Sequence, residues 1–202
     1  MKRFNIKMTA LGLVALAMTA CSSHPDVEGS WMGQPTKLAQ TGTPDVSGIL
    51  ANSQVMTTMV FAPSESDSSK GSVTLMSDIS VMDAIGPNDL ILQTYELSVS
   101  ATAAISGTYQ FTDEDDMAIA LDNNTLTVKV DPSAVTFNAN MVTGGQDPQL
   151  DTIKPQLAQS YTVSIGTEMQ AYYATFQRVD DIHVHDGMLT CEINDRDYTF
   201  RK

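Results

Sequence analysis

The chain is poor in cysteine and in basic residues. Its 202 residues include 2 cysteines, so a framework of disulfide bonds cannot stabilise the fold. It has 11 Lys and Arg residues against 24 Asp and Glu residues, which gives a formal net charge of −13 at pH 7. A surface this acidic repels nucleic acid, so we exclude nucleic acid as a partner.

The chain also lacks the short motifs of common catalytic and cofactor sites. It contains no G-x-S-x-G nucleophile elbow, no zinc-protease helix motif, no phosphate-binding loop and no dinucleotide fingerprint. Cys191 shares the expected buried side of its strand with Leu189 and Ile193, and no basic neighbour activates its thiol. We therefore expect a protein that is not an enzyme and that uses no cofactor.

The N-terminus has the pattern of a secretion signal. Lys2, Arg3 and Lys7 precede an uncharged apolar run from Met8 to Ala20, which is too short to span a membrane. Cys21 follows directly, and the arrangement resembles a bacterial lipobox, in which the cysteine is lipidated and becomes the first mature residue. The resemblance implies a signal peptide at 1–20 and a polar tether at 21–28. It also implies a lipid anchor in the cell envelope, in the outer membrane, on the periplasmic or the outer surface.

Alternation of apolar and polar residues dominates the rest of the chain. It is clearest from Tyr95 to Ile105, and it predicts eight to ten antiparallel strands in one domain at 29–202. The Asn123-Asn124 pair predicts a hairpin turn between two strands. Three final strands are expected around Ile182, Leu189 and Tyr198, with turns at Asp186-Gly187 and Asn194-Asp195.

A helical pattern interrupts the strands at 147–177. Leu150, Ile153, Leu157 and Tyr161 follow helical spacing, and Met169, Tyr172, Tyr173 and Phe176 do so after a break at 164–166. The pattern predicts two short helices before the last three strands, with Thr167 capping the second. The fold class is therefore mostly β: an antiparallel meander barrel, or a sandwich, with an inserted helical pair.

Two groups of residues are candidate binding sites. His183 and His185 alternate along a strand and could bind one metal ion, but Ile182 and Val184 take its buried side, which favours a solvated edge over a metal site. Methionine is abundant, and flexible thioethers can either line a pocket for an apolar ligand or fill a core. The residues expected to line such a pocket are Met56, Met76, Tyr95, Leu97, Tyr109 and Met117.

The ends of the domain resemble the small lipocalin-like lipoproteins of Gram-negative bacteria. The first strand begins Gly29-Ser30-Trp31 around the only tryptophan, and the last strand ends YTFRK. The resemblance implies a barrel with an internal apolar cavity, which Trp31 closes at one end. It also implies that Arg201 packs across the indole as a cation–π contact.

Three hypotheses of function are compared, the first of which agrees best with these expectations. The first is a lipid-anchored lipoprotein that binds a small apolar or amphipathic ligand inside a barrel. The second is an interaction module that docks an envelope protein through the helical flank, where an exposed Tyr172, Tyr173 or Phe176 would favour it, or through a long loop at 35–53. The third is a metal-assisted hydrolase that uses His183 and His185.

Overall fold

A computed structural model describes residues 24–41, 43, 53–85, 94–138 and 150–202. Cys21, the signal at 1–20 and most of the expected loop at 35–53 lie outside these residues. The described elements are β1 (Gly29–Met32), β2 (Thr36–Lys37), β3 (Gln54–Ser64), β4 (Asp67–Ile85), β5 (Tyr95–Phe111), β6 (Met117–Asn138), α1 (Leu150–Ala174), β7 (Arg178–His185), β8 (Met188–Glu192) and β9 (Asp197–Arg201). Two short 3-10 turns, η1 (Leu38–Gln40) and η3 (Thr175–Gln177), complete them.

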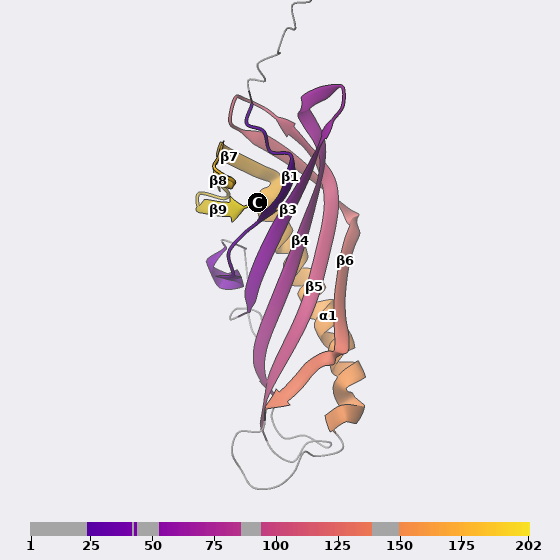
Figure 1. Cartoon of the computed structure of the whole chain (residues 1–202). Helices are drawn as coiled ribbons and strands as arrows, with labels where there is room; N and C mark the ends of the chain where they lie inside the picture. Colours follow the sequence, from indigo (N-terminus) through magenta and orange to yellow (C-terminus); the bar gives the residue numbers. More distant parts are fainter. Residues whose placement is uncertain (1–23, 42, 44–52, 86–93, 139–149) are drawn as a thin grey trace, which may run out of the picture.

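The strands form one antiparallel sheet that closes on itself. Its order is β1-β9-β8-β7-β6-β5-β4-β3-β2, and β1 also pairs with β3. Eight strands therefore make a ring-like closure, which confirms the mostly β, antiparallel fold. The closing contacts are short, because β7 pairs with β6 only at Met117 and Ala118, and β9 pairs with β1 only at Met32. Figure 1 shows β7, β8 and β9 beside one end of β3–β6, which extend well beyond them.

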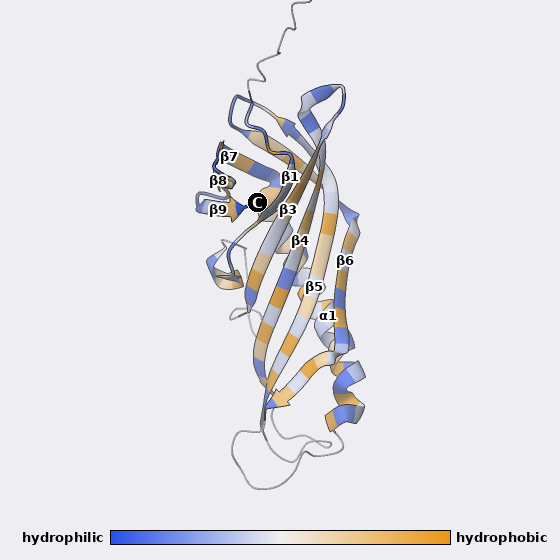
Figure 2. Ribbon diagram, in the orientation of Figure 1, coloured by the Kyte–Doolittle hydropathy of each residue, from blue (hydrophilic) through white to orange (hydrophobic). Residues whose placement is uncertain are grey.

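The long strands follow the alternation of the sequence. In β4 the side chains of Val73, Leu75, Ser77, Ile79 and Val81 are buried, and the residues that alternate with them are half-buried or exposed. The same alternation gives the banded strands of Figure 2. β5 continues through Gly107, where a Cβ would lie 2.2 Å from the Ala120 carbonyl oxygen of β6. A glycine is needed there because the two backbones approach closely.

The expected hairpin at Asn123-Asn124 is wrong. Both halves of β6 pair with β5, and the asparagines lie in a bulge between them. The bulge is closed by polar side chains: Asn124 N donates to Asp122 Oδ1 at 2.9 Å, and Ser106 N donates to Thr125 Oγ1 at 2.9 Å. These bonds replace the ladder bonds that the bulge interrupts.

The C-terminal strands agree with the sequence pattern. Thr112 N donates to Asp116 O at 2.8 Å, so the acidic run 113–116 is the turn between β5 and β6. The expected turns after β7 and β8 are confirmed, since Asp186, Gly187, Asn194 and Asp195 all have positive φ. Asparagine, aspartate and glycine are the residues that tolerate this conformation in tight hairpins.

The two expected helices are one helix. α1 runs unbroken through 164–166, and Ile165, inside the expected break, is 1% exposed. Thr167 is not a cap, because its Oγ1 donates to the Val163 carbonyl oxygen one turn earlier at 3.3 Å. Pro155 lies near the start of the helix, where its missing N–H removes one backbone hydrogen bond. The buried stripe of the helix is Ala158, Tyr161, Ile165, Met169, Tyr172 and Tyr173.

α1 covers the inner face of the long strands. It packs mainly against β6 and also against β5, and its stripe belongs to the same hydrophobic core as the inward side chains of β3–β6. Figure 1 shows the helix running along one face of these strands, past the end of the ring. The helix therefore buries apolar residues that the ring does not enclose.

β6 is the edge of the long part of the sheet, and it is interrupted a second time. Between Val99↔Val135 and Ala101↔Val130 the register shifts, and residues 131–134 form a bulge. Asp131 Oδ1 accepts hydrogen bonds from Ser133 N at 2.8 Å and Ser133 Oγ at 2.6 Å, which lower the pKa of that carboxyl group. A bulge that carries Pro132 and a charge discourages pairing with another strand.

The single helix makes a direct prediction for stability. Replacing the buried Ile165 with alanine should lower the free energy of unfolding by about 2–4 kcal/mol, because it leaves a cavity between α1 and the sheet. The matched variant Val163→Ala changes a side chain that is 68% exposed, and it should cost less than about 0.5 kcal/mol. Urea unfolding of both variants measures the difference; equal, small effects would mean that the helix does break at 164–166.

Candidate ligand sites at the ring mouth and on the outer face

Trp31 is held at the closure of the ring. Its side chain is 1% exposed, and its Nε1 donates to the Val27 carbonyl oxygen at 2.7 Å. Gly29 has a φ of +110°, and a Cβ there would lie 2.9 Å from Cε of Lys202. The glycine of the Gly29-Ser30-Trp31 motif therefore serves both backbone conformation and close packing.

The cation above the indole is Lys202 and not Arg201. Lys202 Nζ lies 4.8 Å from the centre of the Trp31 ring, whereas Arg201 is exposed and pairs with Met32. Consecutive residues of a strand point to opposite sides, so a shift of one position exchanges the two cations. The assignment of Arg201 from the family resemblance is corrected to the next residue.

The expected tether also contacts the domain. Val27 is buried in the core, and the ring of His24 stacks on Phe111 with 4.7 Å between ring centres. Residues 24–28 are thus part of the packed structure.

The six residues expected to line one pocket do not come together. Met76 is 43% exposed, and Met56 also points to the outer face, because Thr57 and Ser77 take the inward positions beside them. Leu97 and Met117 are buried in the core, and Tyr95 packs in a separate small cluster with Leu150. Tyr109 is buried as well, and its hydroxyl has no hydrogen-bond partner among the described residues.

The two histidines of the candidate metal site and Cys191 belong to no cluster of metal-binding residues that the described structure shows. His183 and His185 are both exposed, as the strand alternation predicted. The described part of the chain has no group of three or more His, Cys, Asp or Glu residues that could hold a metal ion. Cys191 is 5% exposed, and burial raises the pKa of its thiol to about 12, so the thiolate is scarce at neutral pH.

A chain of four buried hydroxyl groups links α1 to the sheet. Thr57 Oγ1 lies 2.8 Å from both Ser77 Oγ and the Tyr172 hydroxyl, and the Tyr173 hydroxyl donates to Ser77 Oγ at 3.0 Å. Thr57 and Ser77 are the only residues of the described β3 and β4 that are both polar and buried. Ser77 interrupts the apolar side of its strand in the sequence, which is the signal that could have located this cluster.

The hydroxyl chain has one proton to spare. Four hydroxyl groups bring four protons to three hydrogen bonds, so one O–H remains free to donate. When Tyr173 donates to Ser77, Ser77 to Thr57 and Thr57 to Tyr172, the free proton belongs to Tyr172. Burial raises the pKa of Tyr172 above its ordinary value and that of Tyr173 to about 12, so both groups stay protonated at neutral pH.

The hydroxyl chain ends in an open cleft of about 380 Å³, which we call the mouth cleft. It lies just beyond the C-terminal end of β1, between the β1–β2 segment, β3, the end of α1 and β9. Arg196 donates to the Gln40 carbonyl oxygen and the Tyr198 hydroxyl donates to that of Thr41 at 3.4 Å, so these bonds connect the two sides of the cleft. Its lining residues are Gly33, Gln34, Thr36, Gln40, Val55, Thr57, Tyr172, Arg196, Asp197, Tyr198, Thr199 and Phe200.

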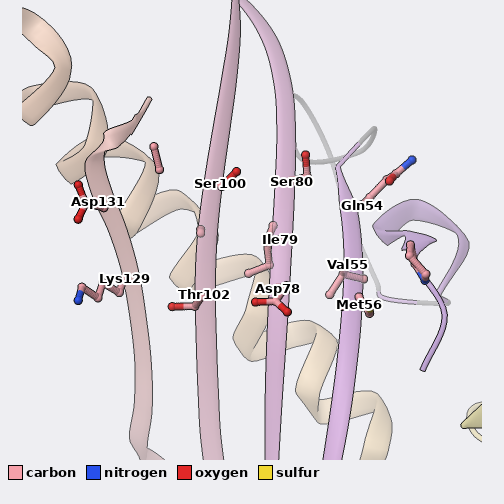
Figure 3. Close-up of a pocket in the computed structure, with 13 residues that line it drawn as sticks. Gln54, Val55, Met56, Asp78, Ile79, Ser80, Ser100, Thr102, Lys129 and Asp131 are labelled. Carbon is pink, nitrogen blue, oxygen red and sulfur yellow. The ribbon is translucent and has the colours of Figure 1, made fainter. Parts of the chain in front are cut away.

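A second hollow of about 510 Å³, the outer groove, lies on the opposite face of the sheet. Figure 3 shows it crossing β3–β6, with α1 behind the strands. The small side chains of Ser80, Ser100 and Thr102 leave space at its floor, and Pro35 and the 131–134 bulge contribute at its two sides. Met56, Asp78, Lys129 and Asp131 also line it.

Comparisons with known proteins give no assignment. No protein-family model matches the sequence, and no match was found among curated proteins or among solved structures. Within the described residues, no helix has the length and apolar character needed to cross a membrane.

The hydroxyl chain predicts an asymmetry between two neighbouring threonines. Thr57→Val keeps the shape of the side chain but leaves Ser77 and Tyr172 without their shared partner, so it should lower the free energy of unfolding by about 1–3 kcal/mol. Thr58→Val makes the same change on the outer face and should cost less than about 0.5 kcal/mol. Chemical denaturation compares the two; equal costs would show that the buried hydroxyl bonds contribute nothing.

Proposed function

We propose that this protein is a lipid-anchored lipoprotein of the cell envelope, in the outer membrane, that binds a small amphipathic ligand in the mouth cleft. The observation that carries the proposal is the placement of Thr57 and Tyr172. Thr57 is 4% exposed and Tyr172 is 3% exposed, yet both residues line a cleft that opens to solvent. Buried polar groups at the floor of an accessible hollow are typical of ligand sites.

The cleft has the chemistry of a site for an amphipathic molecule. Val55, Tyr198 and Phe200 offer apolar and aromatic surface, and Gln34, Gln40 and Thr199 offer polar groups. A volume of about 380 Å³ lies within the range of about 300–1,000 Å³ that is usual for small-molecule sites. The ligand class is therefore a compact molecule with an apolar body and at least one oxygen acceptor.

The donors of the cleft define the polar end of this ligand. The Tyr172 hydroxyl can carry the spare proton of the hydroxyl chain, and the exposed Arg196 is the basic residue of the lining. In that arrangement both groups donate toward the cleft, and the Arg196 guanidinium has no acceptor atom, so a carbonyl or carboxylate oxygen fits this pair better than an amine.

The anchor and the barrel type belong to the same proposal. The lipobox pattern at Cys21 supports acylation, and more than one acyl chain gives lasting membrane attachment. A lipocalin-like barrel is supported by the ring of eight strands. It is also supported by the Gly29-Ser30-Trp31 strand, because the ammonium group of Lys202 lies over the indole of Trp31. The competing hypothesis of an interaction module would be favoured by an exposed aromatic patch on the helical flank, but Tyr172, Tyr173 and Phe176 are all buried.

Dye binding tests the mouth cleft. Anilinonaphthalene sulfonate combines an aromatic body with an anionic head, and we expect one molecule per chain with increased fluorescence. Tyr172→Phe should weaken binding about tenfold, because a hydrogen bond to a charged group contributes about 1.5 kcal/mol. Arg196→Gln should also weaken it, by removing the cation.

The matched control is Tyr161→Phe. Tyr161 lies on the same helix, but its hydroxyl donates to Asp83 Oδ2 at 2.7 Å, outside the lining of the cleft, so this variant should bind the dye like the wild type. Wild-type affinity in both Tyr172→Phe and Arg196→Gln would reject the mouth cleft. Failure of the dye to bind, together with no ligand in native mass spectra of the extracted protein, would reject ligand binding altogether.

Membrane fractionation tests the anchor separately. Cys21→Ser should move the protein from the membrane fraction to the soluble fraction, because the acylated thiol is lost. Cys191→Ser changes the only other cysteine and should leave the protein in the membrane fraction. If Cys21→Ser also stays with the membrane, the proposed lipid anchor is wrong.

A further inference from the structure

Methionine is unusually exposed on the outer face of the sheet. Among the described residues the exposed large hydrophobic side chains are Met32, Met76, Met82 and Val163, with exposures of 52%, 43%, 65% and 68%. Three of these four are methionines, and they lie on strands whose inward residues form the core. They are therefore not core filler, and their side chains are available to solvent.

The strand register brings three methionines around one threonine. Thr58 of β3 is paired with Met32 of β1 on one side and with Met76 of β4 on the other. Met56 lies two residues before Thr58 on the same strand and so points to the same face. We call Met32, Met56 and Met76 the outer methionine cluster.

The spacing of the cluster allows three sulfur atoms to meet. Adjacent strands lie about 4.8 Å apart, so the Cα atoms of Met32 and Met76 are roughly 10 Å apart, with Met56 about 7 Å along the central strand. Methionine is unbranched and has three rotatable bonds, so each thioether can turn toward the space above Thr58. The small Thr58 side chain leaves that space open.

The chemistry of the cluster selects a soft monovalent cation. Thioether sulfur favours Cu(I), whereas carboxylate and carbonyl oxygens favour harder ions. Asp78 is exposed and pairs directly with Met56, and the chain is strongly acidic, so the local and overall charges attract a cation. No histidine or cysteine is required for such a site.

We propose that the outer methionine cluster binds one Cu(I) ion through the sulfur atoms of Met32, Met56 and Met76. The site lies on the face of the sheet opposite α1 and next to the outer groove, of which Met56 is a lining residue. It is separate from the mouth cleft, and neither site depends on the other.

Competition with a chromogenic Cu(I) chelator tests this site. The extracted full-length protein is titrated without oxygen against the Cu(I)–bicinchoninate complex, and the wild type should remove one Cu(I) per chain. Met32→Leu, Met56→Leu and Met76→Leu preserve side-chain volume and fold. Each should weaken binding at least tenfold, since each removes one of three ligands.

Two controls separate this site from other sulfur atoms. Met82→Leu removes an exposed methionine of the same strand and face as Met76, and Cys191→Ala removes the buried thiol. Both should bind Cu(I) like the wild type. No removal of Cu(I) from the chelator, an unchanged affinity in the three cluster variants, or an equal loss in either control would overturn the proposal.

A second measurement reports on the sulfur atoms themselves. Mild peroxide converts exposed methionines to sulfoxides, which peptide mass spectrometry locates. Ag(I) is a soft cation that does not undergo redox cycling with peroxide. It should protect Met32, Met56 and Met76 from oxidation and leave Met82 unprotected. Protection of all four, or of none, contradicts a defined three-sulfur site.

Discussion

The packing of α1 against the inner face of β3–β6 is the interaction on which the rest of the structure depends. The ring closes only near one end of the long strands, through Met32 and through Met117 and Ala118. Beyond that end, inward side chains of β5 and β6 would face water without the helix. The same packing fixes the last turn of α1, so Tyr172 and Tyr173 meet the hydroxyl groups of β3 and β4.

One feature of the strand register then determines both proposed sites. Thr57 and Ser77 face inward, where their hydroxyl groups bond to the end of the helix, and Thr57 also lines the mouth cleft. Their neighbours Met56 and Met76 must face outward, where they join Met32 around Thr58. A slip of one residue would bury the methionines and expose the hydroxyl groups, so the mouth cleft and the outer methionine cluster depend on the same pairing.

The sequence predicted the sheet better than its interruptions. Alternation located the long strands, and positive-φ residues located the final turns. It failed at Asn123-Asn124, because Asp122 and Thr125 close a bulge with side-chain bonds that no pattern reveals. It also failed at Ile165, because small polar neighbours concealed a continuous helical stripe. The mouth cleft was out of reach, since its lining comes from distant segments that only the fold assembles.

Hydrogen exchange of the native protein tests the central role of α1 most directly. If one helix seals the sheet, amides from Ala158 to Tyr173 should exchange as one unit, with the same opening free energy as the central residues of β4 and β5. Independent exchange of the residues before and after 164–166, with the second part opening at a much lower free energy than the sheet, would contradict a single helix that holds the strands and the mouth cleft together.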